Sequence, residues 1–438
     1  MGVSKLLSPF QKFVKIESFS GILLVAATVI ALLWANSPWA ASYSDLWNYK
    51  LGFSSDQFTL NKPLILWIND GLMAVFFYLI GLEIKRELLI GELNSVKKAM
   101  FPLFGAIGGM TIPVLLFLFL NNNPETTPGW GIPMATDIAF SLAILKALGN
   151  RVPLSLKIFL TAFAIVDDIG AVMVIAIFYS GALKVTLLGY AGILLVVLYL
   201  LSWKGYYSKF INILLGIIVW TLFLKAGVHP TLAGILLAFA VPVRQNIGKT
   251  KFVERLGEIT GLIKSSANND SPILTKKQIE YVDNLEDLTD QYQSPLQRLE
   301  HQLHGWVAYV IIPIFALANA GVALNSDVPL DTALVTNIAI ALVIGNSVGI
   351  STLVLLAKKF KIITVPQEIN SMQIVGVAFL AGVGFTMSIF ICGLAYAGNS
   401  VFIDSGKIGI IIGSLVSGII GYVILRFARK EPYNEEEV

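Results

Sequence analysis

The stretch from Leu154 to Tyr179 reads LSLKIFLTAFAIVDDIGAVMVIAIFY and carries two adjacent aspartates, Asp167 and Asp168, in an almost wholly apolar run. One charged side chain at the centre of a bilayer costs roughly 2.5–3.5 kcal/mol. Two of them cost about 5–7 kcal/mol on that scale, against a typical folding stability of roughly 5–15 kcal/mol. Carboxylates at this depth usually face a water-filled cavity and handle ions or protons. The pair therefore indicates an ion-handling membrane protein.

The composition supports the interpretation of this stretch as a membrane helix. The 438 residues are 56% hydrophobic and 13% charged, with a mean hydropathy of +0.75. A soluble protein carries about twice that share of charged residues. Twelve apolar segments are candidates to cross the roughly 30 Å of hydrocarbon. They are Phe19 to Ala35, Pro63 to Leu82, Met100 to Leu120, Gly131 to Leu148, Leu154 to Tyr179, Val185 to Trp203, Ile211 to Leu224, Leu232 to Val243, Trp306 to Val322, Ala333 to Leu356, Gln373 to Ala397 and Ile408 to Phe427.

Basic residues predict the orientation, because Lys and Arg are retained on the cytoplasmic side. With a cytoplasmic N-terminus, the outward loops hold five of the 31 basic residues: Lys50, Lys62, Lys184, Lys225 and Lys407. Both termini are therefore expected in the cytoplasm of a bacterium, with the protein in its cytoplasmic (inner) membrane. The first apolar run is longer than the core of a secretory signal and is interpreted as a retained anchor.

Several other classes of protein find no support in the sequence. Cys392 is the single cysteine, and the three histidines lack metal-ligand spacing, so no disulfide framework, resident metal or other cofactor is expected. There is no phosphate-binding loop for pumping driven by ATP and no Gly-x-Ser-x-Gly nucleophile elbow. A net charge of +3 does not suggest nucleic acid as a partner.

The chain is predicted to be one membrane domain with one polar interruption. Residues 1–243 hold spans one to eight, 244–304 form a cytoplasmic insertion, 305–427 hold spans nine to twelve, and 428–438 form a cytoplasmic tail. Within the insertion, Ser265 to Ser271 (SSANNDS) is predicted to be a flexible break, and apolar residues spaced by three over Lys276 to Gln291 predict a short amphipathic helix. Two interpretations of the 244–304 segment remain open: a tolerated insertion and a regulatory element.

Two of the apolar segments contain residues that interrupt helices. Segment four contains Gly131-Ile-Pro-Met-Ala-Thr-Asp137, and segment eleven contains Gly382-Val-Gly-Phe-Thr386. Irregular backbone at membrane depth survives only where it is buried in protein or lines a cavity. Interrupted segments at corresponding places in two halves indicate the binding site of a transporter. Two discontinuous helices are therefore expected, with Gly382, Gly384 and Thr386 lining the site and Asp137 neutralising the positive helix ends. The alternative is that these glycines only permit close helix packing.

The carboxylates suggest a chemistry of exchange. Neighbours on a helix point about 100° apart, so Asp167 and Asp168 cannot both face one point, and Asp137 from segment four would complete a cage with Thr136 and free carbonyls. Such oxygens suit a small hard cation. Burial disfavours the charged form of a carboxylate, so each aspartate is expected to exchange a proton near physiological pH. A proton and a cation would then compete for one site, which suffices for antiport.

At this point the chain resembles the NhaA sodium/proton antiporters over nearly its whole length apart from the insertion. The motifs that carry the resemblance are Asn69–Phe77 (NDGLMAVFF), Gly81–Leu88 (GLEIKREL), Pro133–Phe140 (PMATDIAF), Val166–Ala171 (VDDIGA), Gly227–Gly234 (GVHPTLAG), Phe315–Gly321 (FALANAG) and Gly382–Phe390 (GVGFTMSIF). The resemblance implies an all-α membrane protein of about twelve helices with inverted repeats. It also implies a homodimer.

The resemblance also implies roles for individual residues. Asp168 would be the main ligand of the transported sodium, with Asp167 beside it and Asp137 and Thr136 at the crossing of the broken helices. Three further residues, at the cytoplasmic side, would match the region with which the family senses pH: Glu83, Glu300 and His301. The long insertion falls directly before that stretch.

The sequence departs from the family pattern in segment ten. The best-known members have a lysine after Ile-Gly that pairs with the first aspartate, whereas this chain has Asn346 after Ile344-Gly345. Without that cation, Asp167 is expected to be harder to ionise, because a nearby positive charge favours the charged form of a carboxylate. We expect an altered affinity or pH dependence and a lower proton-to-cation ratio. Lys358 lies too near the segment end to substitute.

The resulting prediction is a secondary antiporter without enzyme activity, exporting sodium or lithium against protons across the lipid bilayer. A sodium-coupled symporter of an organic solute would use a similar scaffold but needs a larger polar site. An intramembrane aspartyl protease would need facing aspartates such as Asp137 and Asp168, and its Gly-x-Gly-Asp element is absent because Gly384 is followed by Phe385. A passive channel fits poorly with tightly binding carboxylates at midplane.

Overall fold

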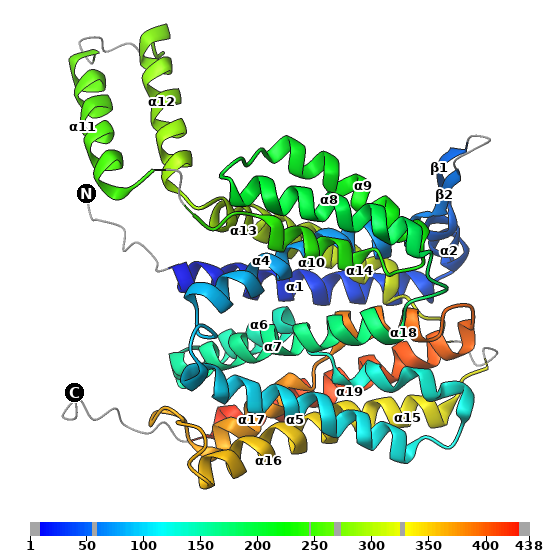
Figure 1. Cartoon of the computed structure of the whole chain (residues 1–438). Helices are drawn as coiled ribbons and strands as arrows, with labels where there is room; N and C mark the ends of the chain where they lie inside the picture. The colour runs from blue at the N-terminus through cyan, green and yellow to red at the C-terminus, as the bar shows by residue number, and fades with distance from the viewer. Residues whose placement is uncertain (1–8, 55–58, 245–246, 267–272, 325–328, 429–438) are drawn as a thin grey trace.

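A computed structural model describes residues 9–54, 59–244, 247–266, 273–324 and 329–428. Each of the twelve predicted segments contains helix, and Figure 1 shows the membrane helices lying side by side along one general direction. In order, the segments contain α1 (Pro9–Ala35); α3 (Leu64–Trp67), η1 (Ile68–Leu72) and α4 (Met73–Ile90); α5 (Val96–Leu120); η2 (Pro124–Met134) and α6 (Ile138–Ala147); α7 (Leu154–Phe178); α8 (Val185–Trp203); α9 (Lys209–Ala226); α10 (Thr231–Ala240); α13 (Pro295–Trp306), η4 (Val307–Ile311) and α14 (Ile312–Asn319); α15 (Thr332–Ile340), η5 (Ala341–Gly345) and α16 (Asn346–Lys359); α17 (Ser371–Ala381) and α18 (Phe385–Ala395); and α19 (Ser400–Phe427).

Not every segment contains a helix long enough to span the membrane. Among the described residues, eight helices are long and apolar enough to span a membrane, and the number rises to ten if each bent pair is one span. One bent pair is α17 with α18, at 42°, and the other is α1 with α2 (Ala40–Asn48), at 113°. The helices α6 and α10, in segments four and eight, have ten residues each. An all-α membrane fold is therefore confirmed, and twelve complete membrane spans stay a prediction.

Both predicted interruptions are present. In segment four, the 3₁₀ helix η2 ends at Met134, and an extended link precedes α6, which begins at Ile138. In segment eleven, α17 ends at Ala381 and α18 begins at Phe385. Pro133 explains the first break in part, because a proline ring excludes the hydrogen bond that would continue the helix. The prediction of two discontinuous helices is confirmed.

The interrupted segments occupy matching places in two triplets of spans. Each follows a long helical span, α5 in one case and α15–η5–α16 in the other, and each precedes another, α7 or α19. Corresponding members are seven segments apart along the chain, an odd number, so the triplets run through the bundle in opposite directions. The long members pack on each other: a Cβ on Gly108 of α5 would lie 2.3 Å from the carbonyl oxygen of Gly349 in α16. Only glycine allows so close an approach.

Two large groups of buried apolar side chains fill the bundle around the breaks. One joins α1, α4, α14 and α18 and includes the fully buried Phe77 and Phe315. The other joins α5, α7, α16 and α17 and includes Phe163. The interrupted segments are thus enclosed by packed helices, which is where irregular backbone is tolerated at membrane depth.

The insertion folds as an antiparallel pair of helices, α11 (Lys249–Ser266) and α12 (Lys276–Tyr292), which projects from the bundle (Figure 1). The predicted amphipathic helix is α12, and its Tyr292 ring stacks on Phe252 of α11 at a centroid distance of 4.1 Å. The predicted break is described only at Ser265 and Ser266; the rest of it lies outside the described residues, as do residues 429–438 of the predicted tail. The helix of segment nine begins at Pro295, inside the predicted insertion.

A small β-hairpin at the opposite end of the bundle was not predicted. Its strands are β1 (Lys50–Ser54) and β2 (Thr59–Pro63), paired antiparallel with Lys50 opposite Pro63. The remaining element is the short 3₁₀ turn η3 (Gly149–Arg151). Figure 1 shows the hairpin and the α11–α12 pair at different ends of the membrane helices, so they lie on opposite sides of the membrane domain.

Candidate functional site: the crossing of two interrupted helices

The two interruptions meet directly through their backbones. The Asp137 N–H donates to the Val383 carbonyl oxygen at 2.7 Å, so the link before α6 touches the link before α18. Gly384 permits this contact, because a Cβ there would lie 2.5 Å from the Ala135 carbonyl oxygen. Sequence positions almost 250 residues apart therefore form one crossing inside the bundle.

Asp137 bridges the N-termini of the two helices that follow the interruptions, α6 and α18. Its carboxylate accepts the Phe140 N–H at 3.1 Å in α6, and at α18 it accepts the Thr386 N–H at 3.1 Å and the Thr386 hydroxyl at 2.6 Å. The side chain is buried, with 3% of its surface exposed. Each helix N-terminus carries about half a positive charge, and an anion between two of them is stabilised by both. This is the arrangement expected from the sequence.

At the crossing, the negative C-terminal end of α17 accepts hydrogen bonds from two hydroxyl groups. α17 ends there, and its last carbonyl oxygens lose their i+4 helical partners, although the Leu380 carbonyl oxygen still accepts the Val383 N–H at 3.1 Å. The Thr136 hydroxyl donates to the Ala381 carbonyl at 2.8 Å, and the Ser141 hydroxyl donates to the Leu380 carbonyl at 2.8 Å. Ser141 was not predicted; its position one helical turn after Asp137 is the only signal in the sequence.

The aspartate pair separates as helical geometry requires. Asp167 is 1% exposed, and its Oδ2 accepts the Thr136 N–H at 3.0 Å. Its Oδ1 is buried and has no hydrogen-bond donor within the described part of the chain. Asp168, the next residue along α7, is partly exposed. One carboxylate is thus fixed to the crossing, and its neighbour, about 100° further round α7, is less buried.

Asn346 of α16 contacts the last turn of η2, just before the same link. Its side chain is fully buried, and its amide N–H group donates to the Pro133 carbonyl at 2.9 Å. The Asn346 Oδ1, like the Asp167 Oδ1, lacks a donor among the described residues. A buried carboxylate or amide oxygen without a donor is costly, and a bound cation would remove that cost. Lys358 lies twelve residues further along α16, about 18 Å away at the rise of a helix, as expected.

A second group of charged residues lies nearer the insertion, on α4 and α13. The Arg86 Nε donates to both oxygens of Glu300, at 2.9 and 3.0 Å, and the Glu83 Oε1 lies 3.8 Å from the His304 Nδ1. His301 is exposed and does not belong to this group. The helical period explains the difference, because His304 is four residues from Glu300 and shares its face, whereas His301 points about 100° away.

Two interrupted helices that cross beside buried carboxylates, inside a bundle of membrane-length helices, define a secondary transporter. The chain belongs to the Na+/H+ antiporter 1 family, whose model matches residues 11–425. Family membership confirms the resemblance drawn from the motifs, and this is a family of transporters rather than enzymes.

Individual relatives match along nearly the whole chain, and each is named Na(+)/H(+) antiporter NhaA. The protein of Oleidesulfovibrio alaskensis is 45% identical over 429 residues, which are 97% of this chain and 95% of the relative. The protein of Sulfurimonas denitrificans is 42% identical over 429 residues, 97% of each chain. The protein of Bacteroides fragilis is 40% identical over 429 residues, 96% of this chain and 98% of the relative.

Proposed function

We propose that the protein exports sodium, or lithium, in exchange for protons across the cytoplasmic membrane of a bacterium. One observation carries this proposal: Asp167 and Asp168 lie at the crossing of the interrupted helices, where Asp167 and Asn346 each present a buried oxygen without a donor. The names of the relatives favour the same exchange. Sodium homeostasis and pH homeostasis are the processes that such an exchange serves.

The residues at the crossing have different roles in the proposed exchange. Asp168 is the main ligand of the transported cation, since it is less buried than Asp167 and points about 100° away from it on α7; Asp167 and Thr136 add oxygens beside it. Asp137 holds the two half-helices together. A proton and a sodium ion compete for the same carboxylates, so release of one accompanies binding of the other. Gly382, Gly384 and Thr386 shape the link that must move when access alternates.

Asn346 distinguishes this chain from the best-known members of the family, which have a lysine at this place. Its amide adds a neutral ligand where a lysine would add a charge, so Asp167 has no cationic partner in segment ten. We therefore propose a lower proton-to-cation ratio than a member with the lysine has. Glu83 and Glu300 are proposed to contribute to the pH response through Arg86 and His304.

The topology of the proposal follows the basic residues. Both termini and the 244–304 insertion lie in the cytoplasm, and the β-hairpin lies outside. The ends of α1 and α19 nearest the termini share one side of the bundle in Figure 1, as two termini in one compartment require. A homodimer is proposed from the family.

Neither rival function gains support from the site. A protease would need Asp137 free to activate water, but three hydrogen bonds from helix N-termini occupy its carboxylate. A symporter for an organic solute would need a larger polar site than the crossing provides.

The test is sodium-driven proton movement in everted vesicles from a strain without antiporters of its own, across pH 6.5–9. We expect the wild type to dequench the proton-sensitive dye on addition of sodium and Asp168→Asn to fail. Full dequenching by Asp168→Asn at normal protein levels would show that the aspartate pair is structural.

A further inference from the structure

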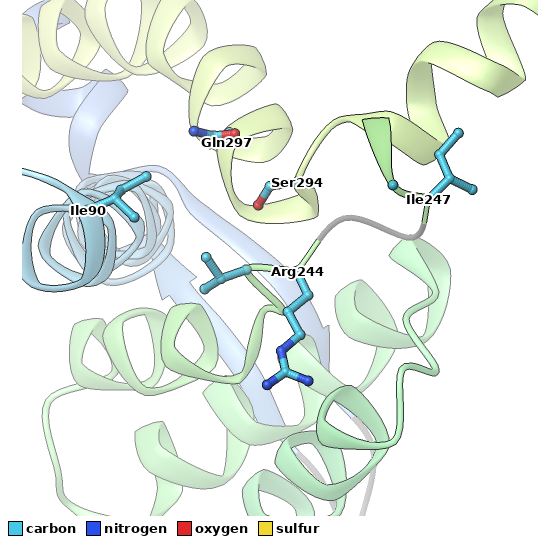
Figure 2. Close-up of a pocket in the computed structure, with 7 residues that line it drawn as sticks. Ile90, Arg244, Ile247, Ser294 and Gln297 are labelled. Carbon is cyan, nitrogen blue, oxygen red and sulfur yellow. The ribbon is translucent and has the colours of Figure 1, made fainter. Parts of the chain in front are cut away.

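A cleft of about 490 Å³ lies at the base of the α11–α12 hairpin, in a different part of the chain from the crossing. Its volume falls within the roughly 300–1,000 Å³ of sites for small molecules. The side chains that line it are three apolar and three polar ones, shown in part in Figure 2: Ile90, Val243, Ile247, Arg244, Ser294 and Gln297. None of the described residues that line it is acidic.

Two helices begin at the wall of this cleft. Gly248, a seventh lining residue, immediately precedes α11, and its carbonyl accepts the Phe252 N–H at 3.1 Å. Ser294 immediately precedes α13, which has 12 residues. Each N-terminus carries about half a positive charge. The first N–H groups of α11 have no partners in their own helix, whereas at α13 Pro295 has no N–H and the Leu296 N–H already donates to the Pro242 carbonyl oxygen at 3.2 Å. The two ends together favour a negatively charged group in the cleft.

Ser294 supplies an independent indication of a ligand. The residue is 4% exposed, and its hydroxyl oxygen has no hydrogen-bond partner within the described part of the chain. It also does not cap its own helix, although serine at this position usually does. Figure 2 shows its side chain pointing from the start of α13 toward the segment that carries Arg244. A buried hydroxyl of this kind requires a partner.

Two helix C-termini come close and must be weighed against the positive ends. α12 ends at Tyr292, but the Gln291 carbonyl oxygen already accepts the Ile247 N–H at 3.3 Å. α4 contributes only Ile90 to the cleft, and the Glu87 carbonyl near its end accepts the Gly91 N–H. Arg244 adds a full positive charge to the wall, although in Figure 2 its side chain extends away from Ser294. The balance therefore favours an anion.

We propose that this cleft binds a phosphate group, held by the Ser294 hydroxyl and the N–H groups at the start of α11, with the positive end of α13 and the Arg244 charge on its wall. The apolar wall formed by Ile90, Val243 and Ile247 accommodates a short carbon skeleton beside the phosphate. The phosphate belongs either to a soluble cytoplasmic compound or to a lipid headgroup, since both present the same chemistry.

Gly248 offers a variant that separates binding from folding. A Cβ there meets nothing within 4 Å, so a side chain fits. Gly248→Asp places a carboxylate at the start of α11, where it stabilises the helix but repels a phosphate. Gly248→Asn has the same shape without the charge. Ser294→Ala removes the hydroxyl, and Ser208→Ala is its control, because Ser208 also precedes a helix, α9, without capping it.

The first experiment measures thermal stabilisation of the purified, delipidated full chain by inorganic phosphate against chloride at equal ionic strength. Bound phosphate raises the melting temperature with concentration. We expect wild type, Gly248→Asn and Ser208→Ala to respond. Gly248→Asp and Ser294→Ala should bind roughly tenfold more weakly, the scale of one lost charge-assisted hydrogen bond. This outcome assigns the site to a soluble phosphate.

The second arm reconstitutes the same variants in vesicles of phosphatidylglycerol or phosphatidylcholine and measures retained lipid by mass spectrometry. Retention of phosphatidylglycerol by wild type and its loss in Gly248→Asp, without a response to inorganic phosphate, assigns the site to a lipid headgroup. The proposal is overturned if neither probe binds, or if Gly248→Asp and Ser294→Ala bind as tightly as their controls.

Discussion

Removal of the Asp137 carboxylate tests how the crossing is held together. In Asp137→Ala, α6 loses its N-cap, at about 1 kcal/mol. The Thr386 N–H is left buried without an acceptor, at about 1–3 kcal/mol, and its hydroxyl loses a further bond of about 1 kcal/mol. The geometry therefore predicts a loss of about 3–5 kcal/mol in the free energy of unfolding.

Asp137→Asn is the matched control for charge. Its amide oxygen still caps α6 by accepting the Phe140 N–H, but its amide nitrogen faces the Thr386 N–H, a donor against a donor. We expect it to keep the capping share and lose the Thr386 share, about 2–4 kcal/mol. A double-mutant cycle with Thr386→Val isolates the hydroxyl bond as a coupling of about 1 kcal/mol.

Unfolding by sodium dodecyl sulfate in mixed micelles, followed by the fluorescence of the eight tryptophans, measures these differences in purified protein. The expected order of stability is wild type, then Asp137→Asn, then Asp137→Ala. If both variants unfold within 1 kcal/mol of wild type, the carboxylate does not join the half-helices, and the reasoning from helix ends fails.

Other residues at the crossing give three further predictions. Thr136→Val removes the hydroxyl that donates to the Ala381 carbonyl oxygen, so it should lower the free energy of unfolding in the same assay by about 1–2 kcal/mol and weaken activation by sodium. Thr136→Ser, which keeps the hydroxyl, should behave as wild type. Gly384→Ala should abolish sodium-driven proton movement because its Cβ collides with the facing link, while Gly393→Ala, which meets nothing within 4 Å, should leave it intact. Asn346→Lys should raise the membrane current per sodium ion in proteoliposomes, and a wild type that already shows the current of lysine-bearing members would refute the proposed ratio.

Part of the site was predictable because it depends on local rules. Apolar length marks membrane segments, and Pro133 and the glycines at 382 and 384 mark the interruptions. The cost of burying charge singles out Asp167 and Asp168 in a run where nothing else explains them. These signals need no partner from elsewhere in the chain.

Other features depend on contacts across long sequence separations. No local rule places Thr386 on Asp137, 249 residues earlier, or Asn346 on the Pro133 carbonyl. His304 rather than His301 approaches Glu83 because α13 presents one face to α4. The α11 helix and the β-hairpin were not predicted, because their apolar residues are few. Their stability comes from the packing of α11 on α12 and the pairing of β1 with β2.

Hydrophobic length, proline and the cost of buried charge act locally, so the amino-acid order alone was enough to identify a multi-span membrane protein with two interrupted helices and a carboxylate pair. The folded bundle alone shows which helix ends face each other, which oxygens remain without donors, and which helices begin beside the cleft at the base of the α11–α12 pair. Those outcomes depend on packing between distant segments, where the energy of each contact exists only once both partners are in place.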